Sequence, residues 1–427
     1  MALFSMEAMM LRKFLATATA AVVLAVGLSG CSAAGANDDK TLVFWTVTQG
    51  DEQLPVLEDM IQRFEDAHPG VTVDLEQRSI DAHKDALRQV AGTGVGPDVY
   101  FYWEGSGLAG ELVDAGLSAD LTSYYNKYDW DDRFTSAALA GITQYGGHHG
   151  VPWTRQAMAV YYNKTLFKKA GIATEPTTYD ELIADADALV DAGVTPIEVG
   201  GTVNWHIMRL LDSLVETECG ATTATALFSG SASWADETCV TASYEQLKTW
   251  GDKYFNDGYL SMSNDDSSLL FFSGDAAMAI EGTWFDGTVV ENGMDPNELG
   301  IFRFPTGTGR LSGFGEALYV NDASTKKDLA ATFLDFVTST PIQKDSVGTW
   351  ASLSANKEVA AGTDNPLDAL WEPFFTEADG VYNPADQSLS GEVTTEYWRI
   401  QNAVLTGEIA PADAGAQLQT FIDGSAK

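Results

Sequence analysis

Short apolar segments alternate with amphipathic ones between residues 41 and 102. Apolar runs without helical spacing are typical of buried strands, whereas apolar residues that recur every three or four positions are typical of helices. This pattern predicts strands at 41–46, 71–75 and 98–102, separated by helices at 54–64 and 82–91. A strand–helix–strand order is typical of a parallel, doubly wound sheet, so we expect an α/β fold.

The rest of the chain continues this mixture of strands and helices. Thr178, with Glu181 three positions later, has the capping-box pattern of a helix start. The chain has 427 residues, which is too long for one compact domain of ordinary size and predicts two lobes. The further predicted elements are strands at 157–162, 193–198, 275–282, 299–304 and 315–320, and helices at 163–170, 178–191, 241–257, 326–339, 396–407 and 411–422.

The N-terminal segment has the layout of an export signal. A cationic pair at 12–13 precedes an apolar stretch at 15–28, which is shorter than the ~20 residues that a spanning helix needs. Leu28-Ser29-Gly30-Cys31 resembles the lipobox of bacterial lipoproteins. We therefore expect a signal segment at 1–31, a lipid on Cys31, a flexible tether at 32–39, and anchoring to the outer face of a bacterial cytoplasmic membrane. An ordinary secretory signal with a chance cysteine is the alternative.

The charge balance limits the classes of partner that the protein can bind. The chain carries 61 acidic and 24 basic residues, a net charge of −37, and such a surface repels nucleic acid and anionic lipid.

Cys219 and Cys239 are the cysteines that remain besides Cys31 in an exported chain, so we expect a disulfide between them. The Gly-, Ser-, Thr- and Ala-rich segment between them would be a mobile surface excursion without such a staple. We expect no metal and no cofactor.

Several short motifs occur in a fixed order from residue 41 to about residue 422. Together they resemble bacterial extracellular solute-binding proteins of the carbohydrate, maltose-binding-protein-like type. The motifs are Thr41 to Trp45 (TLVFW), Gly96 to Val99 (GPDV), Gly150 to Pro152 (GVP), Tyr161 to Lys164 (YYNK), Thr177 to Leu182 (TTYDEL), Phe272 to Met278 (FSGDAAM), Gly282 to Trp284 (GTW) and Ala330 to Leu334 (AATFL).

The resemblance implies two α/β lobes, each a sheet flanked by helices, hinged about a cleft. Lobe 1 would comprise residues 40–148 and 316–349, and lobe 2 residues 149–315 and 350–427. A crossover near Gly313-Phe314-Gly315 suits a hinge, because glycines absorb changes in backbone dihedral angles. The protein would be a monomer and not an enzyme. It would capture a sugar or oligosaccharide by closure and deliver it to the permease subunits of an ABC transporter.

A sugar site needs aromatic platforms for the C–H faces of the rings and planar polar groups for the hydroxyls. The resemblance places Trp284 and Tyr102 at stacking positions. The other candidates lie at the edges of predicted strands, turns and helices: Trp103, Glu104, Trp45, Trp153, Arg155, Trp205, His206, Trp350, Gln49 and Asp51. Trp130, Trp250, Trp371 and Trp398 lie in helical contexts, and most of them are expected to pack in cores.

Two other functions remain open from the sequence. An exported glycan-degrading enzyme would need two carboxylates at a set separation, and Glu104 and Glu281 are a conceivable pair that no motif selects. A binding lipoprotein for a non-sugar solute, such as a peptide or polyamine, is the other alternative. The pairs Tyr161-Tyr162 and His148-His149 are interpreted as a strand and a crossover loop rather than as metal ligands.

Overall fold

The computed structural model describes residues 40–348, 353–362 and 365–425. The signal segment, Cys31, the tether at 32–39 and Trp350 lie outside the described residues. None of the helices that the structure describes is long and apolar enough to cross a bilayer.

Nine strands form one sheet within the described part of the chain, in the order β2-β1-β3-β8-β4-β6-β5, with β7 paired to β4 and β9 to β8. The predicted strands are confirmed, although those predicted at 157–162 and 315–320 begin earlier, at Val151 and Leu311, and β9 is additional. The strands are β1 (Thr41–Val47), β2 (Thr72–Arg78), β3 (Val99–Trp103), β4 (Val151–Asn163), β5 (Thr195–Ile197), β6 (Ala276–Gly282), β7 (Leu299–Phe302), β8 (Leu311–Val320) and β9 (Val381–Tyr382).

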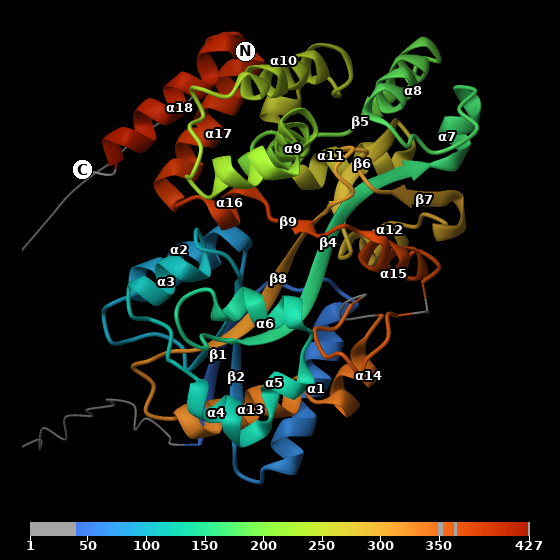
Figure 1. The fold of residues 1–427 in the computed structure, drawn as a ribbon. Helices are drawn as coiled ribbons and strands as arrows, with labels where there is room; N and C mark the ends of the chain where they lie inside the picture. Colours follow the sequence, from blue (N-terminus) through green and yellow to red (C-terminus); the bar gives the residue numbers. More distant parts are fainter. Residues whose placement is uncertain (1–39, 349–352, 363–364, 426–427) are drawn as a thin grey trace, which may run out of the picture. The chain divides into compact units, whose positions relative to one another are not determined.

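The sheet as a whole is mixed, and the parallel arrangement predicted from residues 41–102 is present in its first three strands. β1 pairs in parallel with β2 and β3, and β5 pairs in parallel with β6, as expected for βαβ units. The long strands β4 and β8, however, pair antiparallel with each other, from Val151 opposite Leu318 to Met158 opposite Ser312. β3 adds antiparallel to one end of β8, and β6 adds antiparallel to the other end of β4. The two crossing strands therefore run through both halves of one continuous sheet (Figure 1).

Helices flank both halves of the sheet. All predicted helices are confirmed, and the structure adds further ones, most of them short. Those before β6 are α1 (Gln53–Ala67), α2 (Ile80–Val90), α3 (Ala109–Asp114), α4 (Thr122–Tyr128), α5 (Trp130–Arg133), α6 (Ser136–Thr143), α7 (Lys164–Lys169), α8 (Tyr179–Asp191), α9 (Asn204–Phe228), α10 (Thr238–Lys253) and α11 (Asn264–Ser273). Those after it are α12 (Phe285–Glu291), α13 (Lys327–Val337), α14 (Thr340–Ser346), α15 (Asp368–Glu377), α16 (Ala385–Ser388), α17 (Gly391–Thr406) and α18 (Pro411–Ser425).

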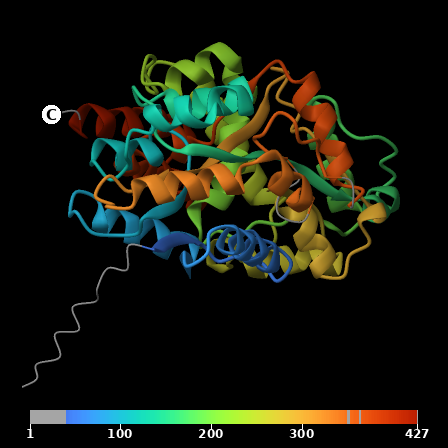
Figure 2. The ribbon, with the colours of Figure 1, turned by 90° about the horizontal axis from the view of Figure 1, so that it is seen from below.

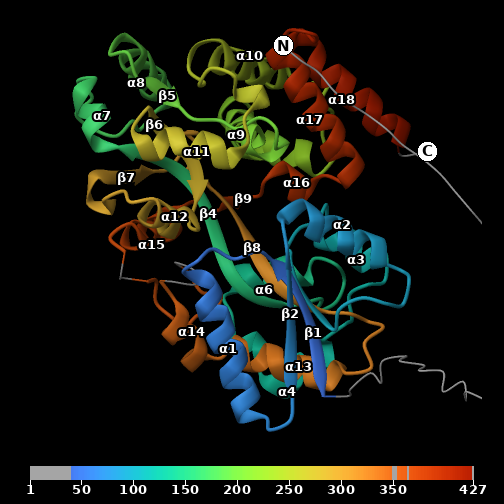
Figure 3. The same cartoon turned by 180° about the vertical axis from the view of Figure 1, so that it is seen from behind.

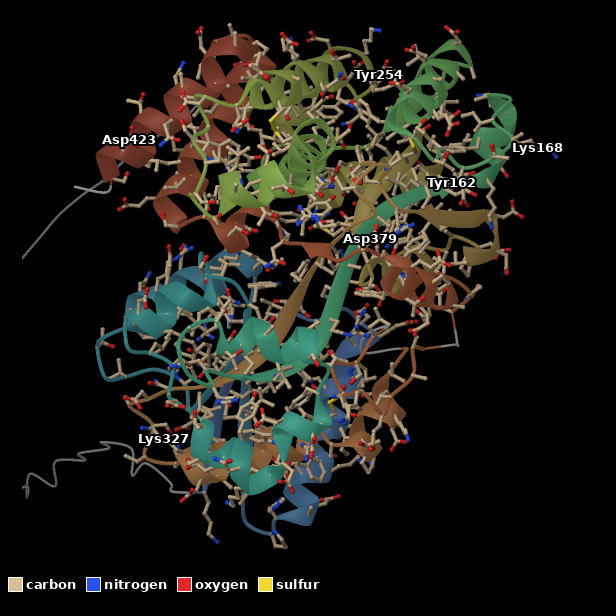
Figure 4. The ribbon with its side chains drawn as sticks, in the orientation of Figure 1. Tyr162, Lys168, Tyr254, Lys327, Asp379 and Asp423 are labelled. Atoms are coloured by element: carbon tan, nitrogen blue, oxygen red, sulfur yellow. A yellow bond between two sulfur atoms is a disulfide. The ribbon has the colours of Figure 1, made fainter. Side chains whose placement is uncertain are left out.

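The buried side chains form separate cores in the two lobes. One core joins β1, β3 and the end of β8 to α1 and α13, where Phe64 packs edge-on against Phe333 at a centroid distance of 5.0 Å. These two helices lie side by side in the view from below (Figure 2). Two further cores lie in the other lobe, around α9, α10 and α17 and around α12 and α15. In Figure 4, Lys327 marks the first lobe, and Tyr162 and Tyr254 mark the second.

The crossing strand β4 belongs to both lobes. Its first residues, Val151 and Trp153, pack in the core of the first lobe, whereas Val160 and Tyr162 pack in the second. The predicted boundary between the lobes, at residues 148 and 316, lies just before β4 and within β8. We retain that boundary as a proposal.

The first half of the segment between the two cysteines is helical, and the second half, from Ser229 to Glu237, consists of turns. α9 continues past Cys219 to Phe228 after a kink at Gly220, whose φ of 70° is in the left-handed region that favours glycine. Leu227 and Trp234 are buried in the second lobe. The predicted disulfide between Cys219 and Cys239 is present and joins α9 to the start of α10.

Candidate ligand-binding cleft

A cavity of about 670 Å³ lies between the lobes and is lined by residues from both of them. The first lobe contributes the end of β1 with the loop at 47–50, the start of α2 and the end of β3. The second lobe contributes α9, α11, the turn from β6 into α12, and the segment at 384–387. The crossing strands β4 and β8 contribute Gln156 and Glu316. The view from behind shows α11 and α12 in the second lobe, above α1 of the first lobe (Figure 3).

Four of the predicted tryptophans line the cavity, and they differ in exposure. Trp284, Trp205 and Trp103 are half-buried and present part of their rings to it, whereas Trp153 is only 2% exposed. The ring of Trp284 also contacts Phe314 of β8, at a centroid distance of 5.9 Å. The predicted Gln49 lines the cavity as well. The structure thus brings these five predicted residues together.

Strand alternation explains which neighbouring candidates reach the cavity. Successive side chains of a strand point to opposite faces. Phe101 and Trp103 of β3 line the cavity, so Tyr102 and Glu104 face the other way and are buried, with exposures of 1% and 5%. In β4, Gln156 lines the cavity and the preceding Arg155 does not; its guanidinium lies 4.8 Å from the ring of Phe375 instead.

The other candidates lie beside the cavity or behind its wall. Trp45 is half-buried beneath the guanidinium of Arg78, 3.9 Å from the ring centroid. Asp51 is exposed and is not among the residues that line the cavity. His206 is buried within the second lobe, behind the cavity wall.

A buried network of charged and polar groups lies beneath the two tryptophans of the second lobe. Trp284 Nε1 donates to Glu281 Oε2 at 2.8 Å. The other oxygen of Glu281 lies 2.6 Å from Arg209 Nη1 and 3.4 Å from His206 Nε2. Burial opposes ionisation of Glu281, but Arg209 and His206 outweigh it and lower the pKa of this carboxyl group to about 2. Glu281 is therefore a permanent anion within the wall.

Glu198, His206 and Glu281 have the residue types of a metal site, and their ligand atoms lie within 4.8 Å of one another. His206 Nδ1, however, accepts a hydrogen bond from the backbone N–H of Gly200 at 3.0 Å. A neutral imidazole with an acceptor at Nδ1 carries its proton on Nε2, which then donates to a carboxylate and has no lone pair for a metal. Arg209 already neutralises Glu281. These residues do not fit a metal ion.

A second hydrogen-bonded carboxyl group lines the cavity on the crossing strand β8. Glu316 Oε2 accepts from Gln156 Nε2 at 2.7 Å and also from the hydroxyl of Thr154. Burial raises the pKa of Glu316, although these hydrogen bonds partly oppose the rise. Amide and carboxyl groups at this position can exchange hydrogen bonds with a hydroxyl-rich ligand.

The charged residues of the lining are mostly acidic. Lys84 is one of two basic residues that line the cavity, and it lies 3.7 Å from Asp386 and 4.9 Å from the ring centroid of Trp103. The other is Arg209, which is paired with Glu281. Both cations therefore have carboxylate partners within the lining. Exposed carboxylates at Asp265 and Asp266 add further negative charge at the start of α11.

Sequence reasoning missed Lys84, Arg209, Glu316 and the segment at 384–387. Arg209 follows Trp205 by four positions on α9, so the two side chains share a helix face, and a predicted helix from Asn204 would have indicated this pairing. Glu316 follows the glycines of the predicted crossover directly. The segment at 384–387 carries no local signal, because it reaches the cavity only through the packing of the C-terminal part of the chain.

The bacterial extracellular solute-binding protein family matches residues 50–344, more than half of the chain. A Brucella abortus relative described as a binding protein is 30% identical over 163 residues, and this match spans 38% of the chain and only 39% of that relative. A multiple sugar-binding protein of Streptococcus mutans is 24% identical over 417 residues, covering 89% of this chain and 91% of that one. An uncharacterized ABC transporter extracellular-binding protein of Pyrococcus horikoshii is 22% identical over 419 residues, covering 94% and 89%.

Solved structures share the fold. A chitin oligosaccharide binding protein superposes with a TM-score of 0.82 at 23% identity, covering 90% of this chain and 98% of that one. A Thermotoga lettingae ABC transporter solute binding protein bound with α-D-tagatose superposes with a TM-score of 0.78 at 19% identity, covering 90% and 99%. The two-lobed fold predicted from the sequence is therefore confirmed, and the family match supports the prediction of a binding protein rather than an enzyme. The chain belongs to the family of bacterial extracellular solute-binding proteins.

Proposed function

We propose that this protein binds a sugar or oligosaccharide in the cavity between its lobes and delivers it to the permease of an ABC transporter. The observation that carries this proposal is the cavity wall, where the rings of Trp103, Trp205 and Trp284 are combined with the amide and carboxyl groups of Gln156 and Glu316. Aromatic faces suit the C–H faces of pyranose rings, and planar polar groups suit their hydroxyls.

The names of similar proteins support a sugar as the ligand. The Streptococcus mutans relative, which aligns along most of this chain, is a multiple sugar-binding protein, and a structural neighbour binds chitin oligosaccharide. The cavity volume of about 670 Å³ is in the range of small-molecule sites, which are typically about 300–1,000 Å³. A di- or oligosaccharide is therefore a suitable occupant.

Binding would proceed by closure of the lobes. The lining comes from both lobes, so a ligand in the cavity contacts both and stabilises the arrangement in which they are close. A ligand that binds the closed form selectively shifts the population toward it by its differential affinity. The closed form would then dock on the membrane subunits of the transporter.

We propose in addition that Cys31 carries the lipid that holds the protein at the outer face of the membrane. Expression of the full chain in a bacterial host, followed by membrane fractionation and mass spectrometry, tests this. The wild type is expected in the membrane fraction with a diacylglyceryl group on Cys31, and Cys31→Ser in the soluble fraction. A wild-type protein that is soluble and unlipidated would contradict the proposal.

The sugar proposal is tested by titrating the protein with maltotriose, cellotriose, xylotriose, chitotriose and raffinose while tryptophan fluorescence and the melting temperature are followed. At least one sugar is expected to shift both, because ligand binding to the folded state stabilises it by RT ln(1 + [L]/Kd). Trp284→Ala is expected to weaken that binding at least tenfold. Phe336→Ala is the control, because Phe336 is also half-buried but lies on α13, outside the cavity lining. A panel without any shift would refute the sugar assignment.

A further inference from the structure

Two tryptophans of the cavity wall share one charged partner. Trp205 is on α9 and Trp284 follows β6, so they are separate in sequence. The guanidinium of Arg209 lies 4.6 Å from the ring centroid of Trp205 and 5.1 Å from that of Trp284. A cation at this distance from an aromatic ring is attracted by the ring quadrupole. Arg209 therefore fixes the positions of the two rings relative to each other.

Arg209 is itself held in place from the second lobe. Its Nη1 donates to the backbone carbonyl of Ile280 at 3.0 Å and lies 2.6 Å from Glu281 Oε1. Its side chain is 9% exposed, and that of Glu281 is 4% exposed. An ion pair with so little water around it keeps a defined geometry, because separation would leave two buried charges without partners.

Glu281 is the second fixed point, because it orients the indole of Trp284 directly. The indole N–H is a donor with one direction, and Glu281 Oε2 accepts it at 2.8 Å. His206, oriented by the backbone N–H of Gly200, supports the other oxygen of this carboxylate. Burial raises the pKa of the neighbouring Glu198, which favours its neutral form and leaves Arg209 and Glu281 as a balanced pair.

We propose that Arg209 and Glu281 are positioning residues that hold Trp205 and Trp284 as one pre-formed stacking surface for the ligand. The proposal rests on the proposed function for the identity of the ligand, but the fixed orientation of the rings is a property of the protein without ligand. A surface that is rigid before binding loses less side-chain entropy on binding than one that must be ordered by the ligand.

The double variant Arg209→Met/Glu281→Met tests the proposal. Replacing both members of a buried ion pair by apolar residues of similar length leaves no unpaired charge and is compatible with folding. The matched control is Glu216→Met/Arg310→Met. Glu216 is on the same helix and is also buried, and it pairs with Arg310 at 2.8 Å away from the lining of this cavity.

The first measurement uses the protein without ligand. Indole N–H resonances are recorded on ¹⁵N-tryptophan-labelled protein, that of Trp284 is assigned through Trp284→Phe, and its exchange with water is measured. In the wild type and in the control this N–H is expected to exchange slowly, and in the Arg209→Met/Glu281→Met variant at least tenfold faster. Equal exchange in all three proteins would overturn the proposal whether or not a sugar binds.

The second measurement uses whichever trisaccharide of the panel binds the wild type. The Arg209→Met/Glu281→Met variant is expected to bind it at least tenfold more weakly, equivalent to about 1.4 kcal/mol, and the control variant with the wild-type affinity. Unchanged affinity in the double variant would show that the ring positions do not depend on the pair and would overturn the proposal. A wild type that binds no sugar would instead refute the proposed function, and the exchange measurement would still decide the positioning role.

Discussion

Replacing Glu104 by glutamine is expected to stabilise the protein at neutral pH, and more so as the pH rises. Glu104 follows β3 and is buried beneath the crossing strand β8, where its backbone N–H donates to Gly315 O at 3.1 Å. A Cβ added to Gly315 or to Gly141 would lie 2.1 or 1.7 Å from Glu104 Oε2, so the carboxyl group fills the space that these two glycines leave. Its Oε1 has no hydrogen-bond partner among the described residues.

The size of the effect follows from the protonation of this group. Burial, assisted by the nearby Glu316, raises the pKa of Glu104 from 4.5 to about 8. Between these values the folded protein keeps a proton that the unfolded chain has lost, so the free energy of unfolding falls as the pH rises. The slope for one group is about 1.4 kcal/mol per pH unit, which amounts to about 3 kcal/mol by pH 7 and about 5 kcal/mol above pH 8. Glutamine has nearly the same shape as glutamate and carries no charge, so the substitution removes this loss of stability.

Urea unfolding followed by tryptophan fluorescence at several pH values from 4.5 to 8 measures the effect. The free energies of unfolding of the wild type and Glu104→Gln are expected to agree near pH 4.5 and to diverge by about 1.4 kcal/mol per pH unit above it. Glu58→Gln, at an exposed position on α1, is the control and should follow the wild type. Parallel curves for the wild type and Glu104→Gln would refute the argument, because they would mean that Glu104 is ionised in the folded protein.

Two further predictions concern particular contacts. Replacing Cys219 and Cys239 by alanine is expected to lower the free energy of unfolding by about 3 kcal/mol, because the disulfide no longer restricts the unfolded chain. Calorimetry of the wild type and the variant without reductant measures the difference. An unchanged melting temperature would contradict the expectation. In Gly107→Ala the new methyl group would lie 1.8 Å from Leu389 O, so the loop at 105–107 must move away from α16. Small-angle X-ray scattering is expected to show a larger radius of gyration for this variant, and titration is expected to show a weaker sugar affinity. If both the radius and the affinity were unchanged, this contact would not hold the lobes together.

Much of the fold could be predicted because the pattern is local. The strands and helices of the βαβ units follow from apolar spacing, and the capping box at Thr178 is present at the start of α8. Trp130, Trp250 and Trp371, expected to pack in cores, are buried. The antiparallel direction of β4 and β8 could not be predicted, because it depends on pairing between strands that are more than 140 residues apart.

The candidate site was predicted to the level of segments rather than of side chains. The sequence indicated the end of β3, but the choice between Tyr102 and Trp103 depends on which face of the sheet the cavity occupies, and one step along a strand reverses the face. In β4 the register shifts between Pro152 and Thr154, which interrupts simple alternation close to Trp153. Such irregularities leave no mark in a pattern of apolar and polar residues.

The pairing of β4 with β8 determines how the lobes can move. Two separate connecting loops would concentrate rotation in a few backbone dihedral angles, whereas β4 and β8 are paired from Val151–Leu318 to Met158–Ser312 and form a short two-stranded ribbon between the parts that also pair with β3 and with β6. Twist between paired strands varies from about 10° to 35°, and it is larger in two-stranded ribbons. Opening can therefore be spread along the ribbon as a change in twist while its ladder stays intact. The ribbon then resists twisting elastically, and its backbone amide hydrogens should exchange slowly with water both before and after closure.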